Sequence, residues 1–284
     1  MKKVKLTLTT AAMVFTAMAY AQSNVKITQL ATETTSAKTS LKSIQFTTGA
    51  AWDKYKNLNM DMLADKTVDM PEYQSKTNSM EKSFQMQAIG LNTGVNLIWA
   101  KPQLSNDMLA AELRTGAAIN LMKESLIEYH NRESGTRESL MYCFVENDIK
   151  FNTDLLFRIG DQSKFSLYSG IGVNASGSFG NELLVFSNYF VNQGVMNEFT
   201  PQSSSGEQNT FTGKNVIYAR AYIPIGFSMK LFRHFETSAE LKLGRGMEQV
   251  VGGSASTFKT GDFSFGLRYN IQRNTAPSIF SLLL

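Results

Sequence analysis

The sequence is poor in the residues that most often build catalytic and metal sites. It contains one cysteine, Cys143, and two histidines among 284 residues. A single cysteine excludes an internal disulfide and a cysteine cluster for a metal ion. After the N-terminal region, no run of about 18 apolar residues occurs, so the sequence predicts no membrane-spanning helix.

Apart from the N-terminal region, the chain also has almost no net charge. Residues 1–21 contain three lysines and no acidic residue, so the 28 basic residues of the chain fall to 25, against 24 acidic ones. This balance gives no argument for a nucleic-acid partner. The mean hydropathy of −0.18 is low, but strands that alternate apolar and polar residues cancel their own hydropathy. The average therefore does not exclude a membrane protein.

Residues 1–21 have the pattern of a secretory signal peptide. Three lysines precede a short apolar region, and Ala19-Tyr20-Ala21 fits a cleavage site. We expect cleavage after Ala21 and a flexible periplasmic lead-in over 22–42, where Thr, Ser, Lys and Gln predominate. No cysteine lies near the cleavage site, which argues against a lipid anchor.

Residues 215–232 alternate between apolar and polar side chains over their whole length. The apolar positions are Ile217, Ala219, Ala221, Ile223, Ile225, Phe227, Met229 and Leu231. A period of two is typical of a β-strand with one apolar and one polar face. About 9–11 tilted residues suffice to cross a bilayer. The segment therefore predicts a transmembrane β-strand with residues to spare.

Seven further segments show the same alternation, at 43–52, 83–100, 107–123, 139–159, 165–179, 235–249 and 260–271. Short turns at 101–106, 160–164 and 233–234 alternate with longer segments at 53–82, 124–138 and 181–214. This rhythm predicts an all-β, antiparallel up-and-down transmembrane β-barrel of eight strands over 43–272, with a C-terminal tail at 273–284. Ten strands are the alternative if 181–214 contains another hairpin.

Two irregularities interrupt the alternation. The apolar positions change parity beside Gly90, which predicts a β-bulge. Pro224 cannot donate a hydrogen bond to a neighbouring strand, so we expect a bulge or local distortion there.

Aromatic residues on the apolar faces fall near the two ends of the predicted strands. Near the short turns lie Trp99, Phe157, Phe165, Phe235 and Tyr269; near the opposite ends lie Trp52, Phe84, Phe179 and Phe263. Amphipathic rings favour the headgroup level of a bilayer. The pattern predicts two aromatic girdles around a lipid-facing barrel.

With these strands in place, the chain resembles the small eight-stranded outer-membrane β-barrel family typified by the OmpA transmembrane domain, OmpX and OmpW. The resemblance covers about 43–271, and its nearest approach to a motif is the alternation of Phe263, Phe265, Leu267, Tyr269 and Ile271. It implies recognition of this last strand by the barrel-assembly machinery. The family usually ends at that strand, whereas this chain continues to Leu284.

The polar faces of the predicted strands carry acidic and basic residues in similar numbers. They are Glu112, Arg114, Glu146, Asp148, Lys150, Asp154, Arg158, Arg220, Lys230, Glu236, Glu240, Lys242, Asp262 and Arg268. An eight-stranded barrel has an interior that side chains alone can fill. We therefore expect a charge-paired plug in the lumen, with a narrow polar pore as the alternative.

Few residues outside the lumen suggest chemistry. His130 lies near Glu128, Glu133 and Ser134, the composition of some lipid A-modifying outer-membrane enzymes, but a surface histidine is more often inert. The acidic residues of 53–82 lack EF-hand spacing, so a solvated loop is expected there. An unusual apolar group could extend a hairpin or bind a partner: Leu183, Leu184, Phe186, Tyr189 and Phe190.

We therefore expect an integral protein of a Gram-negative outer membrane, not an enzyme, with a structural or surface-interaction role. No cofactor or metal is expected. Its expected partners are outer-membrane lipids, lipopolysaccharide, the barrel-assembly machinery and an unidentified extracellular molecule. The alternatives are a small passive pore, a soluble periplasmic barrel with an apolar ligand inside, and a lipid A-modifying enzyme.

Overall fold

The computed structural model describes residues 40–68, 76–101, 104–105, 109–133, 136–159, 164–191, 205–232 and 234–271. The predicted signal peptide, nearly all of the lead-in and the C-terminal tail lie outside these residues.

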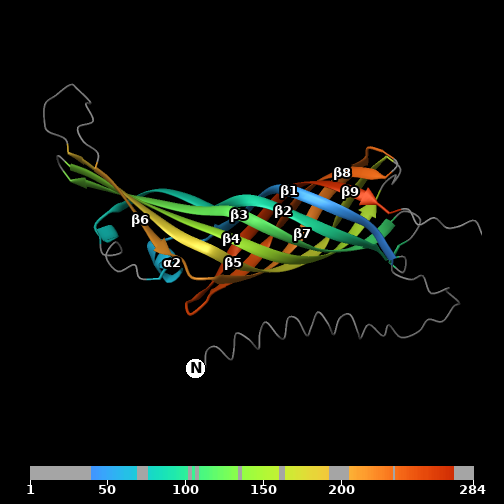
Figure 1. Cartoon of the computed structure of the whole chain (residues 1–284), viewed down its shortest axis with the longest axis horizontal. Helices are drawn as coiled ribbons and strands as arrows, with labels where there is room; N and C mark the ends of the chain where they lie inside the picture. The colour runs from blue at the N-terminus through green and yellow to red at the C-terminus, as the bar shows by residue number, and fades with distance from the viewer. Residues whose placement is uncertain are drawn as a thin grey trace, which may run out of the picture. The chain divides into compact units, whose positions relative to one another are not determined.

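The described chain is almost entirely β-strand. The elements are β1 (Ser40–Tyr55), α2 (Met60–Asp65), β2 (Glu81–Ala100), β3 (Leu109–Glu133), β4 (Thr136–Ile159), β5 (Phe165–Val191), β6 (Ser205–Thr212), β7 (Val216–Lys230), β8 (Phe235–Val250) and β9 (Ala255–Asn270). Each strand pairs antiparallel with its neighbours, and β1 closes the ring by pairing with β9 (Figure 1). The predicted all-β antiparallel barrel is confirmed.

The ring has eight positions, although nine strands take part in the sheet. β5 is long enough to pair with two successive strands: Phe165–Gly177 face β7, and Glu182–Tyr189 face β6. β6 and β7 therefore occupy one position in the ring, separated by residues 213–215. The predicted number of eight barrel strands is confirmed. Residues 183–191 extend the strand β5 as the expected hairpin extension and do not form two further barrel strands.

Both local irregularities have visible consequences. The β2–β3 register shifts on each side of Ile89, so the bulge predicted beside Gly90 is confirmed. At Pro224 the register does not shift, because Ser169–Ile225 and Gly172–Tyr222 share one register, but the pairing of β5 with β7 is interrupted between them, which is the local distortion expected there. The Pro224 carbonyl instead accepts a hydrogen bond from the Ser169 hydroxyl at 3.0 Å.

The prediction that 124–138 is a longer connection between two strands is wrong. β3 and β4 continue through it, with pairs from Glu124–Val145 to Glu133–Thr136. The sequence concealed these strands because their outward positions include charged residues such as Glu124 and Glu128, which removes the apolar alternation. We call this end, with α2 and the long hairpins, the loop end, and the opposite end, with the short connections, the turn end.

The prediction of a solvated loop over 53–82 is also wrong in part. Residues 53–55 belong to β1, and α2 begins after Asn59, whose side chain accepts a hydrogen bond from the Met62 amide at 3.1 Å. α2 buries Met60 and Leu63 in an apolar cluster at the loop end of the barrel. The other fully enclosed members of this cluster include Leu58, Ile127, Leu140, Tyr142, Phe144, Leu183, Val185 and Val216. Within the described residues no helix is both long and apolar enough to cross a membrane.

Below this cluster the two faces of the barrel wall differ sharply. Outward side chains are apolar and exposed: Phe151 is 66% exposed and Ile171 is 65% exposed. Inward side chains are ionic and buried: Arg114 and Arg268 are each 2% exposed. This is the reverse of a water-soluble domain, in which most charged residues lie on the surface and most apolar ones in the core.

Candidate functional site

The barrel interior is a column of ion pairs that begins at the turn end with Glu112. The Arg268 guanidinium donates to both Glu112 carboxylate oxygens, at 3.0 and 3.1 Å, and the Lys42 ammonium lies 2.8 Å away. Arg158 lies 3.5 Å from Glu112 and donates a hydrogen bond to Glu236 at 2.5 Å. Three cations thus share one buried carboxylate, and Glu236 supplies a second negative charge.

The next layer is centred on Arg114. Its Nε atom donates to Asp154 at 2.6 Å, and its two terminal nitrogens donate to Glu240 at 2.7 and 2.9 Å. This fork geometry is the strongest arrangement available to an arginine and a carboxylate. Lys242 approaches Glu240 at 3.5 Å and lies over the Tyr222 ring.

Lys150 and Asp262 form the third layer. The Lys150 ammonium lies 3.0 Å from the Asp262 carboxylate, and the Asn92 amide donates to the same oxygen. Both ions come from facing walls of the barrel, β4 and β9. Each layer therefore crosses the lumen and joins strands that are not neighbours in the sheet.

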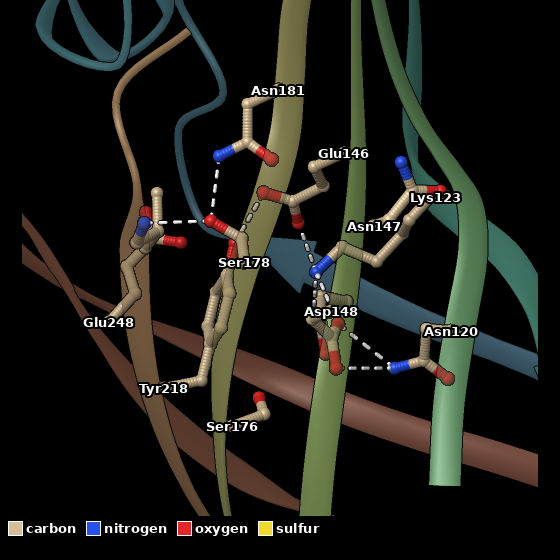
Figure 2. A network of polar contacts seen from close by, with 12 residues as sticks. Asn120, Lys123, Glu146, Asn147, Asp148, Ser176, Ser178, Asn181, Tyr218 and Glu248 are labelled. Atoms are coloured by element: carbon tan, nitrogen blue, oxygen red, sulfur yellow. Dashed lines mark hydrogen bonds and ion pairs between the residues drawn. The ribbon is translucent and has the colours of Figure 1, made fainter.

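The fourth layer gathers charges from four strands, and Figure 2 shows the part of it around Lys123, Glu146 and Asp148. Lys123 contacts Glu146, lies 2.9 Å from Asp53 and 3.8 Å from Asp148. Arg220 reaches the same Asp53 oxygen at 3.0 Å. In the close-up, Asn120 points at Asp148 and donates to both of its oxygens at 3.0 Å, while the Tyr218 hydroxyl donates to Glu146 at 2.5 Å.

The loop that carries α2 closes the column. Lys66, directly after α2, inserts its ammonium group 2.8 Å from Glu248, and the Tyr55 hydroxyl donates to the same carboxylate at 2.8 Å. On the outer side of the loop, Asp65 accepts hydrogen bonds from the Ser254 amide and hydroxyl at 2.8 and 2.6 Å. Burial raises the pKa of Asp65, but the Ser254 hydrogen bonds and the nearby lysines outweigh it and hold the pKa below its ordinary value. Asp65 is thus a charged anchor for the loop at neutral pH.

Two small cavities are found among the described interior residues. One, of about 20 Å³, lies between the third and fourth layers and is lined by Asp53, Lys123, Lys150, Arg220 and Asp262, among others. The second, of about 10 Å³, lies beside Glu112 and Arg158. A water molecule needs roughly 10–15 Å³ of such space, so each has room for about one water.

The structure places thirteen of the predicted lumen residues in this column, and the exception is Lys230. Its side chain is exposed at the last residue of β7, because the barrel wall ends there and Arg158 and Arg268 already neutralise Glu236. Sequence reasoning missed Lys42, Asp53, Lys66, Lys123 and Glu248. Asp53 and Glu248 continue the inward alternation of their strands, a signal that could have been followed further. Lys123 follows a register shift, and Lys66 enters from a loop.

The predicted girdle aromatics all have exposed or half-buried side chains, on outward positions of their strands: Trp52, Phe84, Trp99, Phe157, Phe165, Phe179, Phe235, Phe263 and Tyr269. Their arrangement as two rings in a bilayer stays a prediction.

The apolar group at 183–190 does not form one exposed patch. Leu183 is fully buried in the apolar cluster under α2, and Leu184 and Phe186 are half-buried. Tyr189 and Phe190 have strand backbones paired with β4, and their side chains lie outside the described part. The interpretation of Leu183 as part of a partner-binding surface is therefore wrong, because the strand turns it inward.

In the part of the chain that the structure describes, the two histidines make only local contacts. His130 pairs with Glu128 at 3.1 Å within β3, and His234 lies beside Tyr269 at the turn end. The Ser134 suggested beside His130 lies outside the described residues. Burial raises the pKa of the Cys143 thiol to about 11, and the thiolate is the nucleophilic form of cysteine. Within the described residues, no cluster of three or more His, Cys, Asp or Glu side chains could hold a metal ion.

No protein-family model matches this chain, and no curated protein matches it. Among solved structures it is similar to the outer membrane protein OprG from Pseudomonas aeruginosa, at 11% identity and a TM-score of 0.36, covering 82% of this chain and 97% of that one. It is also similar to a major outer membrane protein from Thermus thermophilus, at 9% identity and a TM-score of 0.31, covering 80% of this chain and 99% of that one. Ail, the attachment invasion locus protein of Yersinia pestis, matches at 10% identity and a TM-score of 0.27, covering 82% of this chain and 100% of Ail. At these values none of the three supplies a role, ligand or partner for this chain.

Proposed function

We propose that the chain is an integral outer-membrane β-barrel with a plugged lumen and a structural or surface-interaction role, not an enzyme. The observation that carries this proposal is the distribution of side chains across the wall. An apolar exterior is stable in lipid, and a closed barrel satisfies every strand edge there. The charges of the four layers are stable because each has an ionic partner within the interior.

The height of the apolar exterior supports this location. On β8, β9 and β1, five successive outward rows carry no charge: Leu243–Gly261–Trp52, Leu241–Phe263–Ala50, Ala239–Phe265–Thr48, Thr237–Leu267–Phe46 and Phe235–Tyr269–Ile44. From Leu243 to Phe235 the strand advances about 26 Å at about 3.3 Å per residue. With a tilt of about 40°, these rows are roughly 20 Å tall, close to the height of about 25 Å of the apolar band of transmembrane barrels.

The location is tested by membrane fractionation combined with gel mobility of the purified protein before and after boiling. We expect the protein in the outer-membrane fraction and a faster band in the unboiled sample, because a closed barrel resists detergent until heated. Recovery in the soluble periplasmic fraction, with no heat-dependent shift, would support the alternative of a soluble barrel and refute the proposal.

The plugged lumen is tested by electrical recording in planar bilayers. We expect no steady open state, because ion pairs fill the interior and the two cavities have room for about one water each. A trimeric porin inserted into the same bilayers supplies the positive control. A reproducible conductance from pure protein at constant voltage would favour the passive pore and disprove the plug while leaving the membrane location intact.

A further inference from the structure

Three cations form one row on the outside of the barrel wall. Lys54 of β1 pairs in register with Lys259 of β9, and Lys259 pairs with Arg245 of β8. All three side chains are exposed. Adjacent strands lie about 4.8 Å apart, so the row spans about 10 Å.

This row has no counter-charge within the described part of the chain. No ion pair joins Lys54, Arg245 or Lys259 to a carboxylate there, and the nearest acids on the same strands, Asp53 and Asp262, point inward to the interior cations. Like charges placed directly opposite on neighbouring strands destabilise a sheet. An anion bound from outside would offset this repulsion.

The row lies at the loop-end boundary of the apolar band. The next row towards the turn end is Leu243–Gly261–Trp52, and the five uncharged rows begin there. The Trp52 ring lies directly against Gly261, where a Cβ atom would approach it to 2.1 Å. Leu243 and Phe263 beside it are 47% and 41% exposed. Cations thus adjoin a broad apolar surface.

The cations are not a general property of this rim. On the other side of the barrel, the outward positions of β3 and β5 near the same end carry Glu124, Glu128 and Glu182, which are exposed or half-buried. Among the described residues, the row of three cations therefore lies on β8, β9 and β1, whereas β3 and β5 carry acidic residues at this end. The cation row and the apolar rows beside it favour a ligand that carries both a negative charge and hydrocarbon chains. A free anion would make no favourable contact with the apolar rows.

We propose that Lys54, Arg245 and Lys259 bind the phosphate groups of a phosphorylated lipid in the outer leaflet, with its acyl chains lying along Trp52, Leu243 and Phe263. This inference rests on the proposed membrane location and adds a specific site to it. Arginine and lysine suit phosphate oxygens through charge-assisted hydrogen bonds. The acyl chains replace the bulk lipid that would cover the same rows.

The test measures lipid retention by native mass spectrometry of the full-length protein in a neutral detergent. The probes are diphosphorylated lipid A, the same lipid with both phosphates removed, and inorganic phosphate. The variant K54Q/R245Q/K259Q removes the row, and the matched control K101Q/K164Q/K230Q removes the same charge near the turn end. Heat-dependent gel mobility establishes that each variant is folded.

We expect the wild type and the control to retain diphosphorylated lipid A, and the row variant to bind it at least tenfold more weakly. The dephosphorylated lipid should bind all three alike, and inorganic phosphate should not compete at millimolar concentration. Equal binding of diphosphorylated lipid A by the wild type and the row variant would overturn the inference, even with a folded, membrane-located barrel. Competition by inorganic phosphate would overturn the lipid as the ligand.

Discussion

Replacing Glu112 by alanine is expected to destabilise the folded barrel by about 3–5 kcal/mol, because it removes one partner of a buried ionic cluster. Glu112 neutralises Arg268, Arg158 and Lys42, and it is 1% exposed. Among the described residues, Glu236 is then left to face both Arg158 and Arg268. The measurement is the free energy of unfolding in urea, with the barrel held in lipid vesicles.

Glu81→Ala supplies the control, since Glu81 is exposed at the start of β2 and has no ion pair within the described chain. An exposed substitution of this kind changes the free energy of unfolding by about 0.5 kcal/mol or less. Glu112→Gln keeps the shape and removes only the charge, so it separates electrostatics from packing. If both Glu112 variants unfold like the Glu81 control, the interior charges do not hold the barrel together, and the plug loses its main support.

The layered charges were accessible to sequence reasoning for a simple physical reason. In a β-strand the side-chain period is two, so one apolar face in lipid fixes the opposite face as the interior. Arg114, Asp154 and Glu240 could therefore be assigned to the lumen without any knowledge of which of them meet. Their pairing across the barrel depends on strand register, which alternation alone does not determine.

Other features could not be predicted because the signal for them is not periodic. The alternation weakens beyond the apolar band, where outward positions carry charged residues such as Glu124 and Glu128, so the long β3–β4 hairpin resembled a loop. At Lys123 the register shifts after Met122, whose φ of 51° lies in the left-handed region. Lys66 reaches the lumen only because α2 folds over the barrel end, and its contact with Glu248 joins residues 182 positions apart.

Placing arginine at Phe265 is expected to cost about 2–4 kcal/mol of folded stability in a bilayer. Phe265 is 56% exposed and belongs to the third of the five uncharged rows, which places it near the middle of the apolar band. Its outward direction leaves a new guanidinium no carboxylate partner among the described residues, because the interior acids lie behind the wall. Unfolding in urea from lipid vesicles measures the loss, and the fraction that inserts during refolding should fall with it.

Thr257→Arg is the matched control for Phe265→Arg. Thr257 lies on the same strand and the same face, one row beyond Lys259 on the loop side of the band, and it is exposed. Near the interface the same substitution costs only about 0–1 kcal/mol, so the depth of the residue is the variable that the pair isolates. A soluble barrel with the same wall would show no such contrast, since water would solvate both arginines equally. Equal stability of the two variants would therefore show that no lipid covers Phe265. The proposal that the apolar outer face of the barrel lies in a membrane, on which the proposed role depends, would then have to be abandoned.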